Sequence, residues 1–253
     1  MIIIKTDSQI NKLRKSGKLV AIVLKTIQKE AKPGVTTLYL NDIAEDIILK
    51  AGAVPSFKGY RGFPFTICSS RNEEIVHGFP TDKPLKDGDI LSVDVGANLD
   101  GWHGDSAITV PIGKVSKQIK ELIKCTEACL YAGILRARPY NRVGDISSKI
   151  ESVAHNKGFD VIKEFVGHGI GRNLHEEPSI PNYGKPHTGY MLKPGMVIAI
   201  EPMVVECCDS AIVLSDGWTT VTGDGGLSAH FEHTVAITLN GPEILTDRRN
   251  LTI

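Results

Sequence analysis

The 253-residue sequence lacks any long hydrophobic run. At its N-terminus only three isoleucines stand together before Lys5, which is too short for the apolar core of a signal peptide or for a membrane span. We therefore expect a cytoplasmic protein with no membrane partner.

Neither sign of charge predominates, and cysteine is scarce. The chain has 29 basic and 29 acidic residues, without a marked basic cluster. Surfaces that bind nucleic acid are basic, so nucleic acid is not expected as a substrate. The five cysteines are an odd number. Without a secretion signal, this predicts reduced thiols and not a disulfide framework.

No linker or low-complexity tract divides the chain, so we expect one domain over residues 1–253. Periodicity predicts helices at about 8–31, with Asp7 or Ser8 as N-cap, from about 37 to Gly52, and at about 117–136 and 146–157. An offset of 106 residues relates the apolar positions of the second and fourth helices, from Leu40 and Ile146 onward. This repeat predicts two halves, about 1–112 and 113–253, with a site between them.

Residues 94–106, DVGANLDGWHGDS, place an aspartate near each end of a predicted β-hairpin. A two-residue loop at Leu99 and Asp100 would set Asp94 directly opposite Asp105. Two carboxylates about 5 Å apart repel by roughly 3 kcal/mol at an effective dielectric constant near 20. We therefore expect either a shared proton or a cation between them.

Three stretches of the second half carry groups that can complete such a site. GHGIGRNLHEEP contains His168 and His175, and its glycine spacing does not fit the dinucleotide-binding fingerprint. GMVIAIEPMVV has Glu201 as its only charge. In AHFEHTVAIT, strand alternation places Glu232 on the face opposite His233.

Taken singly, these residues have ordinary alternatives, such as a strand-edge charge for Glu201 or a satisfied loop histidine for His168. Together they form a set of oxygen donors with one imidazole, as in manganese, cobalt, iron or zinc sites: Asp94, Asp105, His168, Glu201 and Glu232. Two divalent cations neutralise four carboxylates, and one does not. A pair of cations is thus favoured over the shared proton.

In order and spacing, these motifs resemble those of the type I methionine aminopeptidases, which have the pita-bread fold shared with proline-specific peptidases and creatinase. The segments that carry the resemblance are NEEIVHGFP, DVGANLDGWHGDSA, GHGIGRNLHEEPSIPNYG, AIEPMV and FEHTVAIT. The resemblance covers about residues 5–248. It implies an α+β fold with two pseudo-twofold-related αβ halves around a central antiparallel sheet. The 30 residues between Glu201 and Glu232 leave no room for the helical insert of the second class.

The resemblance also implies residue roles. The five ligands named above would bind two divalent cations, bridged by Asp105 and Glu232. Glu201 would act as general base, and His77 and His175 would donate hydrogen bonds to the scissile amide and the developing oxyanion. The methionine pocket would be lined by Tyr60, Phe63, Cys68, His77, Trp218 and Leu174. Three residues depart from the family pattern and affect the shape of the pocket: Leu174, Phe57 and His230.

The implied activity is removal of the N-terminal methionine from nascent proteins and peptides with a small second residue. We expect a monomer, and a contact with the ribosome is left open. One alternative is a proline-specific aminopeptidase on the same fold, which would use the same metals. The other is a non-catalytic binding module, which is disfavoured because all five ligands are present.

Overall fold

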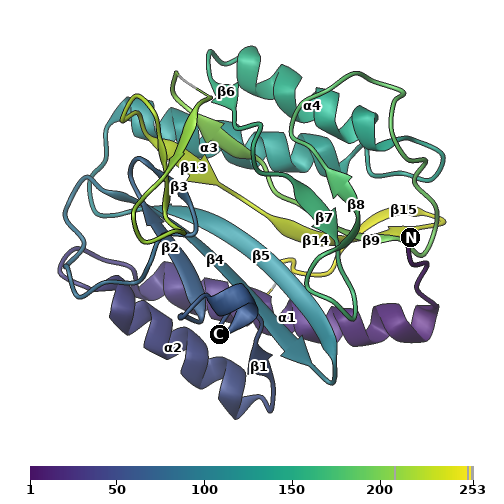
Figure 1. Cartoon of the computed structure of the whole chain (residues 1–253), viewed down its shortest axis with the longest axis horizontal. Coiled ribbons are helices and arrows are strands. Elements are labelled where there is room, and N and C mark those ends of the chain that lie inside the picture. The colour runs from purple at the N-terminus through teal and green to yellow at the C-terminus, as the bar shows by residue number, and fades with distance from the viewer. Residues whose placement is uncertain (208, 250, 252–253) are drawn as a thin grey trace.

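The computed structural model describes residues 1–207, 209–249 and 251. Two pairs of helices lie on opposite sides of a layer of strands (Figure 1). They are α1 (Asp7–Glu30) with α2 (Thr37–Lys50), and α3 (Lys117–Ile134) with α4 (Val143–His155). None of the described helices is both long and apolar enough to cross a membrane.

The strands form four sheets, and every strand pair in the described part of the chain is antiparallel. The first sheet has the order β1 (Val54–Pro55), β4 (Ile90–Leu99), β2 (Ile67–Arg71), with β5 (Trp102–Pro111) also paired to β4. The second is β15 (Gly241–Ile244), β14 (His233–Thr238), β9 (Val197–Ile200), β7 (Gly167–Gly169), β8 (Glu176–Ile180). Two smaller sheets are β13 (Ser228–His230), β10 (Met203–Val205), β6 (Asp160–Val161), and β11 (Ala211–Val213), β12 (Thr220–Thr222), β3 (Glu74–Val76). The architecture is α+β, as predicted.

The helix starts differ from the prediction because of local capping. Thr6, and not Asp7 or Ser8, caps α1: its hydroxyl accepts from Gln9 N at 3.3 Å, and the Gln9 side chain accepts from Thr6 N at 2.9 Å. The fourth helix starts at Val143, not at 146, because the Asp145 carboxylate accepts from the backbone N–H of Arg142 at 2.8 Å. Capping contacts thus extend both helices beyond their periodic apolar residues.

One hydrophobic core joins both predicted halves. It takes fully buried side chains from all four helices and both large sheets, including Leu24, Leu40, Ile90, Ile146 and Ile198. The described residues on either side of position 112 therefore share one interior. The division into halves stays a prediction.

The predicted register of the β4–β5 hairpin is wrong. Asp94 pairs with Ala107, and Asp105 pairs with Gly96. The reason is the turn, whose central residues are Asp100 (φ 55°) and Gly101 (φ 77°), the two positive angles that a type I′ turn requires. The two aspartates lie diagonally on the same face, where side chains still approach one another.

The two large sheets meet along β5 and β14, through threonine and serine hydroxyl groups. The Thr234 hydroxyl donates to Asp105 O at 2.7 Å and accepts from Asp105 N at 3.0 Å. The Ser106 hydroxyl donates to Glu232 O at 2.5 Å. This contact, which we call the hydroxyl seam, connects the segments that carry Asp105 and Glu232.

Replacing Gly104 by alanine should destabilise the protein by about 1–3 kcal/mol through overpacking. Helix α1 approaches β5 so closely that a Cβ at Gly104 would lie 2.8 Å from Gly17 N and 2.9 Å from Ser16 C. Urea unfolding measures the effect. Gly226→Ala is the matched control, because its Cβ would meet only the Asp224 side chain, at 3.1 Å. Equal midpoints for the two variants would contradict this packing.

Candidate metal centre

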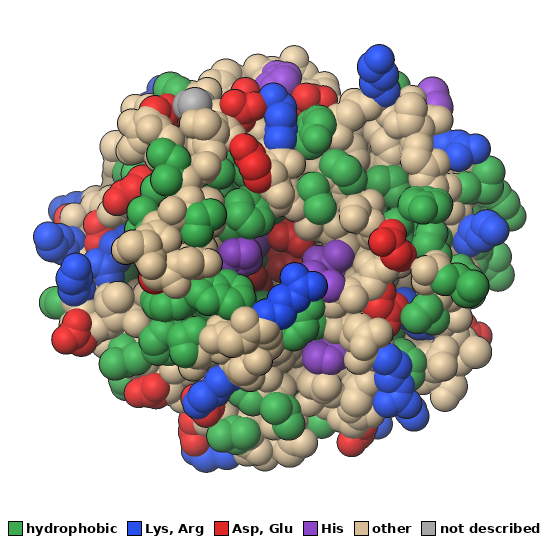
Figure 2. Space-filling view, viewed as in Figure 1, with side chains coloured by type: hydrophobic (Ala, Val, Ile, Leu, Met, Phe, Trp, Pro, Cys, Tyr) green, Lys and Arg blue, Asp and Glu red, His purple; other side chains and the backbone are tan. Residues whose placement is uncertain are grey.

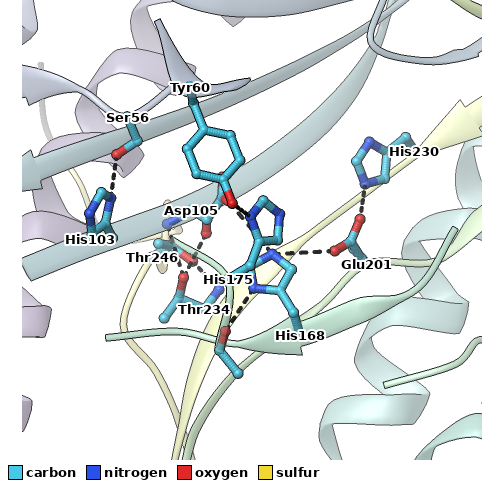
Figure 3. Close-up of polar contacts among 11 residues, drawn as sticks. Ser56, Tyr60, His103, Asp105, His168, His175, Glu201, His230, Thr234 and Thr246 are labelled. Atoms are coloured by element: carbon cyan, nitrogen blue, oxygen red, sulfur yellow. Dashed lines mark hydrogen bonds and ion pairs between the residues drawn. The ribbon is translucent and has the colours of Figure 1, made fainter. Parts of the chain in front are cut away.

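Five acidic and imidazole side chains from separate segments line one cavity of about 180 Å³. They are Asp94 on β4, Asp105 on β5, His168 on β7, Glu201 directly after β9 and Glu232 directly before β14. Ligand atoms of Asp105, His168 and Glu232 lie within 4.8 Å of one another. His168 Nε2 also lies 3.6 Å from Glu201 Oε1 (Figure 3). The structure thus brings together all five residues predicted as ligands.

Burial makes this cavity unfavourable for free carboxylates. Desolvation raises the pKa of Asp94 to about 7 and raises the pKa values of Asp105, Glu201 and Glu232 well above their ordinary range. Three carboxyl oxygens are buried without a hydrogen-bond partner among the described residues: Asp94 Oδ1, Asp105 Oδ1 and Glu232 Oε1. Unpartnered buried oxygens facing one cavity are donors for a hard divalent cation, so the residues present fit such a group.

His168 is oriented as a ligand. Its Nδ1 lies 2.9 Å from Gly169 O, so Nδ1 carries the proton and donates it to this carbonyl group. Nε2 then keeps its lone pair and faces the carboxylates. Burial lowers the pKa of His168 to about 3, which keeps the imidazole neutral.

Glycines flank His168 because neighbouring backbones approach closely. A Cβ at Gly167 would lie 2.4 Å from Ala199 O, and one at Gly169 would lie 2.2 Å from Glu177 O. These contacts pack β7 between β8 and β9. The motif GHG therefore fixes the position of the imidazole relative to Glu201, which follows β9.

The side chains predicted for the methionine pocket line the same cavity: Tyr60, Phe63, Cys68, His77, Leu174 and Trp218. Phe63 and Trp218 meet edge to face with ring centroids 5.2 Å apart. Cys68 lies directly across from Asp94 in the β2–β4 pair. An apolar wall that contains sulfur thus adjoins the carboxylates.

The two predicted substrate-binding histidines contact different aromatic side chains of this wall. His77 meets the Trp218 ring edge to face at 6.0 Å, and burial lowers its pKa to about 4. His175 is exposed at the cavity mouth, where its Nδ1 lies 2.9 Å from the Tyr60 hydroxyl (Figure 3). Its ring centroid is 4.3 Å from that of His168. Both rings therefore line the cavity of the proposed ligands, and His175 lies directly beside one of them, His168.

Two features of this region were not assigned a role from the sequence. Arg61 lines the cavity, and its only signal was its place directly after Tyr60. His230 is buried, with Nε2 3.7 Å from Glu201 Oε2 (Figure 3). The sequence marked His230 only as a departure from the family pattern.

Without bound cations, the contribution of the four carboxyl groups to the free energy of unfolding should decrease as pH increases, because folding raises their pKa values. A carboxyl group whose pKa is raised by folding binds its proton more tightly in the folded state. Its contribution to the free energy of unfolding then falls between its ordinary pKa, about 4, and its folded value, which is about 7 for Asp94. Each group contributes up to about 1.4 kcal/mol per pH unit in this interval.

Saturating manganese should cancel this loss, since the cation binds the deprotonated carboxylates. Thermal unfolding should therefore differ more between manganese-loaded and chelator-treated protein at pH 7.5 than at pH 5. A difference that does not change with pH would contradict the assignment of these carboxyl groups.

Comparisons with known proteins agree with this geometry. The model of metallopeptidase family M24 matches residues 11–239. Methionine aminopeptidase 1 of Bacillus subtilis is 51% identical over 246 residues, which cover 97% of this chain and 99% of that protein. The crystal structure of methionine aminopeptidase from Thermotoga maritima has a TM-score of 0.96 at 48% identity and covers 98% of this chain and 100% of its own.

A more distant structure, the Xaa-Pro dipeptidase from Bacillus anthracis, is 23% identical with a TM-score of 0.76, covering 99% of this chain and 63% of its own. That likeness concerns the fold alone. The structural neighbours confirm the predicted pita-bread fold. With matches of this extent in family, sequence and structure, the chain belongs to metallopeptidase family M24 and, within it, to the methionine aminopeptidases.

Proposed function

We propose that the protein hydrolyses the first peptide bond of nascent proteins and peptides that begin with methionine, favouring a small second residue. The observation that carries this proposal is a single cavity in which buried carboxyl oxygens without partners adjoin an apolar wall of aromatic and sulfur-containing side chains. The first feature fits metal-dependent hydrolysis, and the second fits a thioether side chain.

The five side chains of the cluster are proposed to hold two divalent cations, with Asp105 and Glu232 shared between them. Manganese, cobalt, iron and zinc all suit four carboxylates and one imidazole. Bound there, the cations would supply a water nucleophile of lowered pKa and would stabilise negative charge on the scissile carbonyl group.

Glu201 is proposed as general base. One of its oxygens faces His168 Nε2 at 3.6 Å, and the other faces His230 Nε2 at 3.7 Å. The first is placed to act as a ligand, which leaves the second to take a proton from the attacking water. A carboxylate oxygen that is not bound to a cation can accept this proton and return it to the leaving amine.

His175 and His77 are proposed to bind the substrate's amide groups. When the Tyr60 hydroxyl donates to His175 Nδ1, the ring proton lies on Nε2 and is available to the oxyanion. His77 is neutral because burial lowers its pKa, so it too offers one N–H donor. Its place beside Trp218 suits the scissile amide next to the methionine side chain.

The shape of the cavity supports cleavage at the chain terminus. Its inner end holds buried groups such as Asp105 and Glu232, whereas Arg61 and His175 are exposed at its mouth. A peptide must enter with its first residue foremost. We propose that the enzyme acts as a monomer in the cytoplasm on newly made chains, and leave any contact with the ribosome open.

The first test is release of methionine from Met-Ala-Ser by chelator-treated protein, titrated separately with manganese, cobalt, iron and zinc. At least one metal should restore activity, and Asp94→Asn should abolish it because the variant lacks a ligand. An Ala-Pro peptide is the substrate control. Cleavage of that peptide and not of Met-Ala-Ser would favour the proline-specific alternative.

His175→Ala should lower turnover by about 10²–10³-fold, the cost of losing one oxyanion donor, with metal still bound. Calorimetric titration of the variant with manganese measures the stoichiometry. His155→Ala is the matched control, since His155 is an exposed histidine paired with Asp160, and its turnover should be unchanged. Loss of metal from His175→Ala would show that His175 had been assigned the wrong role.

A further inference from the structure

The cavity mouth carries a single cation. Figure 2 shows acidic side chains at the bottom of a hollow in this face, with histidine and basic side chains near its edge. Among the described residues that line the cavity, Arg61 is the only lysine or arginine, and Arg61 and His175 are the only exposed ones. When the first residue of a peptide lies inside the cavity, the rest of the peptide must therefore pass Arg61 and His175.

A tight turn holds Arg61 at this position. Arg61 has φ 50° between Gly59 (φ 87°) and Gly62 (φ 92°), and Gly59 N donates to Phe63 O at 2.7 Å. A positive φ is uncommon for a residue with a long side chain. Backbones of this kind persist where the surrounding structure enforces them, often at ligand-binding sites. The turn therefore fixes the direction in which the Arg61 side chain leaves the backbone.

The guanidinium group lies near Tyr60 in the apolar wall and has no carboxylate partner among the described residues. Arg61 Cζ is 5.4 Å from the centre of the Tyr60 ring, whose hydroxyl contacts His175 Nδ1 at 2.9 Å. In the described part of the chain Arg61 forms no ion pair, unlike the neighbouring Lys58, which contacts Glu45 at 2.6 Å.

We propose that Arg61 selects the third residue of the substrate and favours an acidic side chain there. This inference rests on the proposed function, in which His175 contacts the scissile bond. The Tyr60 ring centre lies 5.3 Å from the His175 ring and 5.4 Å from Arg61 Cζ, so the guanidinium group is at most about 11 Å from His175. Two extended residues at about 3.3 Å each, followed by an aspartate side chain in contact with the guanidinium group, cover this distance. The two residues after the scissile carbonyl are the second and third of the substrate. Arginine pairs with a carboxylate through two N–H donors, and here no protein carboxylate competes.

Two amidated peptides test the proposal, Met-Ala-Asp-Ala and Met-Ala-Asn-Ala, because they differ in charge and hardly in size. The ratio of kcat/KM for the aspartate peptide over the asparagine peptide should be about two to five, as for an exposed ion pair. It should fall toward one in 1 M KCl, where the screening length is about 3 Å. In Arg61→Gln the ratio should be near one, and in Arg61→Glu it should be below one.

Two further variants separate charge from structure. Arg61→Lys keeps the cation and should keep part of the preference, although it loses the paired donors. Lys58→Gln removes a nearby exposed cation that does not line the cavity, so its ratio should equal that of the unmodified protein. A ratio near one in the unmodified protein, or a preference that survives in Arg61→Gln, would overturn the proposal. Absence of methionine release from both peptides would instead contradict the proposed function.

Discussion

Four carboxyl groups share one cavity, where they repel one another and are largely removed from water. The rest of the structure must offset both of these unfavourable effects. Their raised pKa values show that the folded chain alone does not stabilise the charged forms. Neutralisation by protons would block the oxygens as ligands, whereas neutralisation by divalent cations uses them. A divalent cation bound to these oxygens would therefore stabilise the folded state by the free energy of its binding.

Because the four carboxyl groups repel one another, the segments that carry them must be held together. The hydroxyl seam does this for the segments of Asp105 and Glu232. Thr234 satisfies both backbone groups of Asp105 with one side chain, so the carboxyl group of Asp105 is left to face the cavity. Arg248 donates to the Ser106 hydroxyl at 2.6 Å, which in turn donates to Glu232 O. Burial lowers the pKa of Arg248 to about 10, so it still brings a positive charge near the carboxylates at neutral pH. Arg248 thus supports, through Ser106, the proposed ligand Glu232, which lies between β13 and β14.

The five proposed ligands stand out in the sequence because each is a charged or imidazole group within a short apolar or glycine-rich segment, and the structure places all five at one cavity. Their mutual arrangement was less accessible, as the β4–β5 register shows. The sequence NLDG allows two positions for a two-residue turn. The turn forms at Asp100 and Gly101 and not at the predicted Leu99 and Asp100, because aspartate and glycine tolerate positive φ better than leucine. The diagonal placement of Asp94 and Asp105 follows from that turn. The helix starts were missed for a related reason, since capping is decided by single side chains such as Thr6 and Asp145.

The residues that depart from the family pattern lie at the walls of the cavity or behind a ligand. Leu174 and Phe57 are buried side chains that line the cavity, so a change there alters which side chains fit. His230 faces Glu201 from outside the lining, and its backbone is fixed by Thr109, whose hydroxyl donates to His230 O at 2.8 Å. None of the three belongs to the five ligands or to the hydroxyl seam. Selectivity can therefore vary through the walls while the chemistry, which needs the ligands in fixed positions, stays the same.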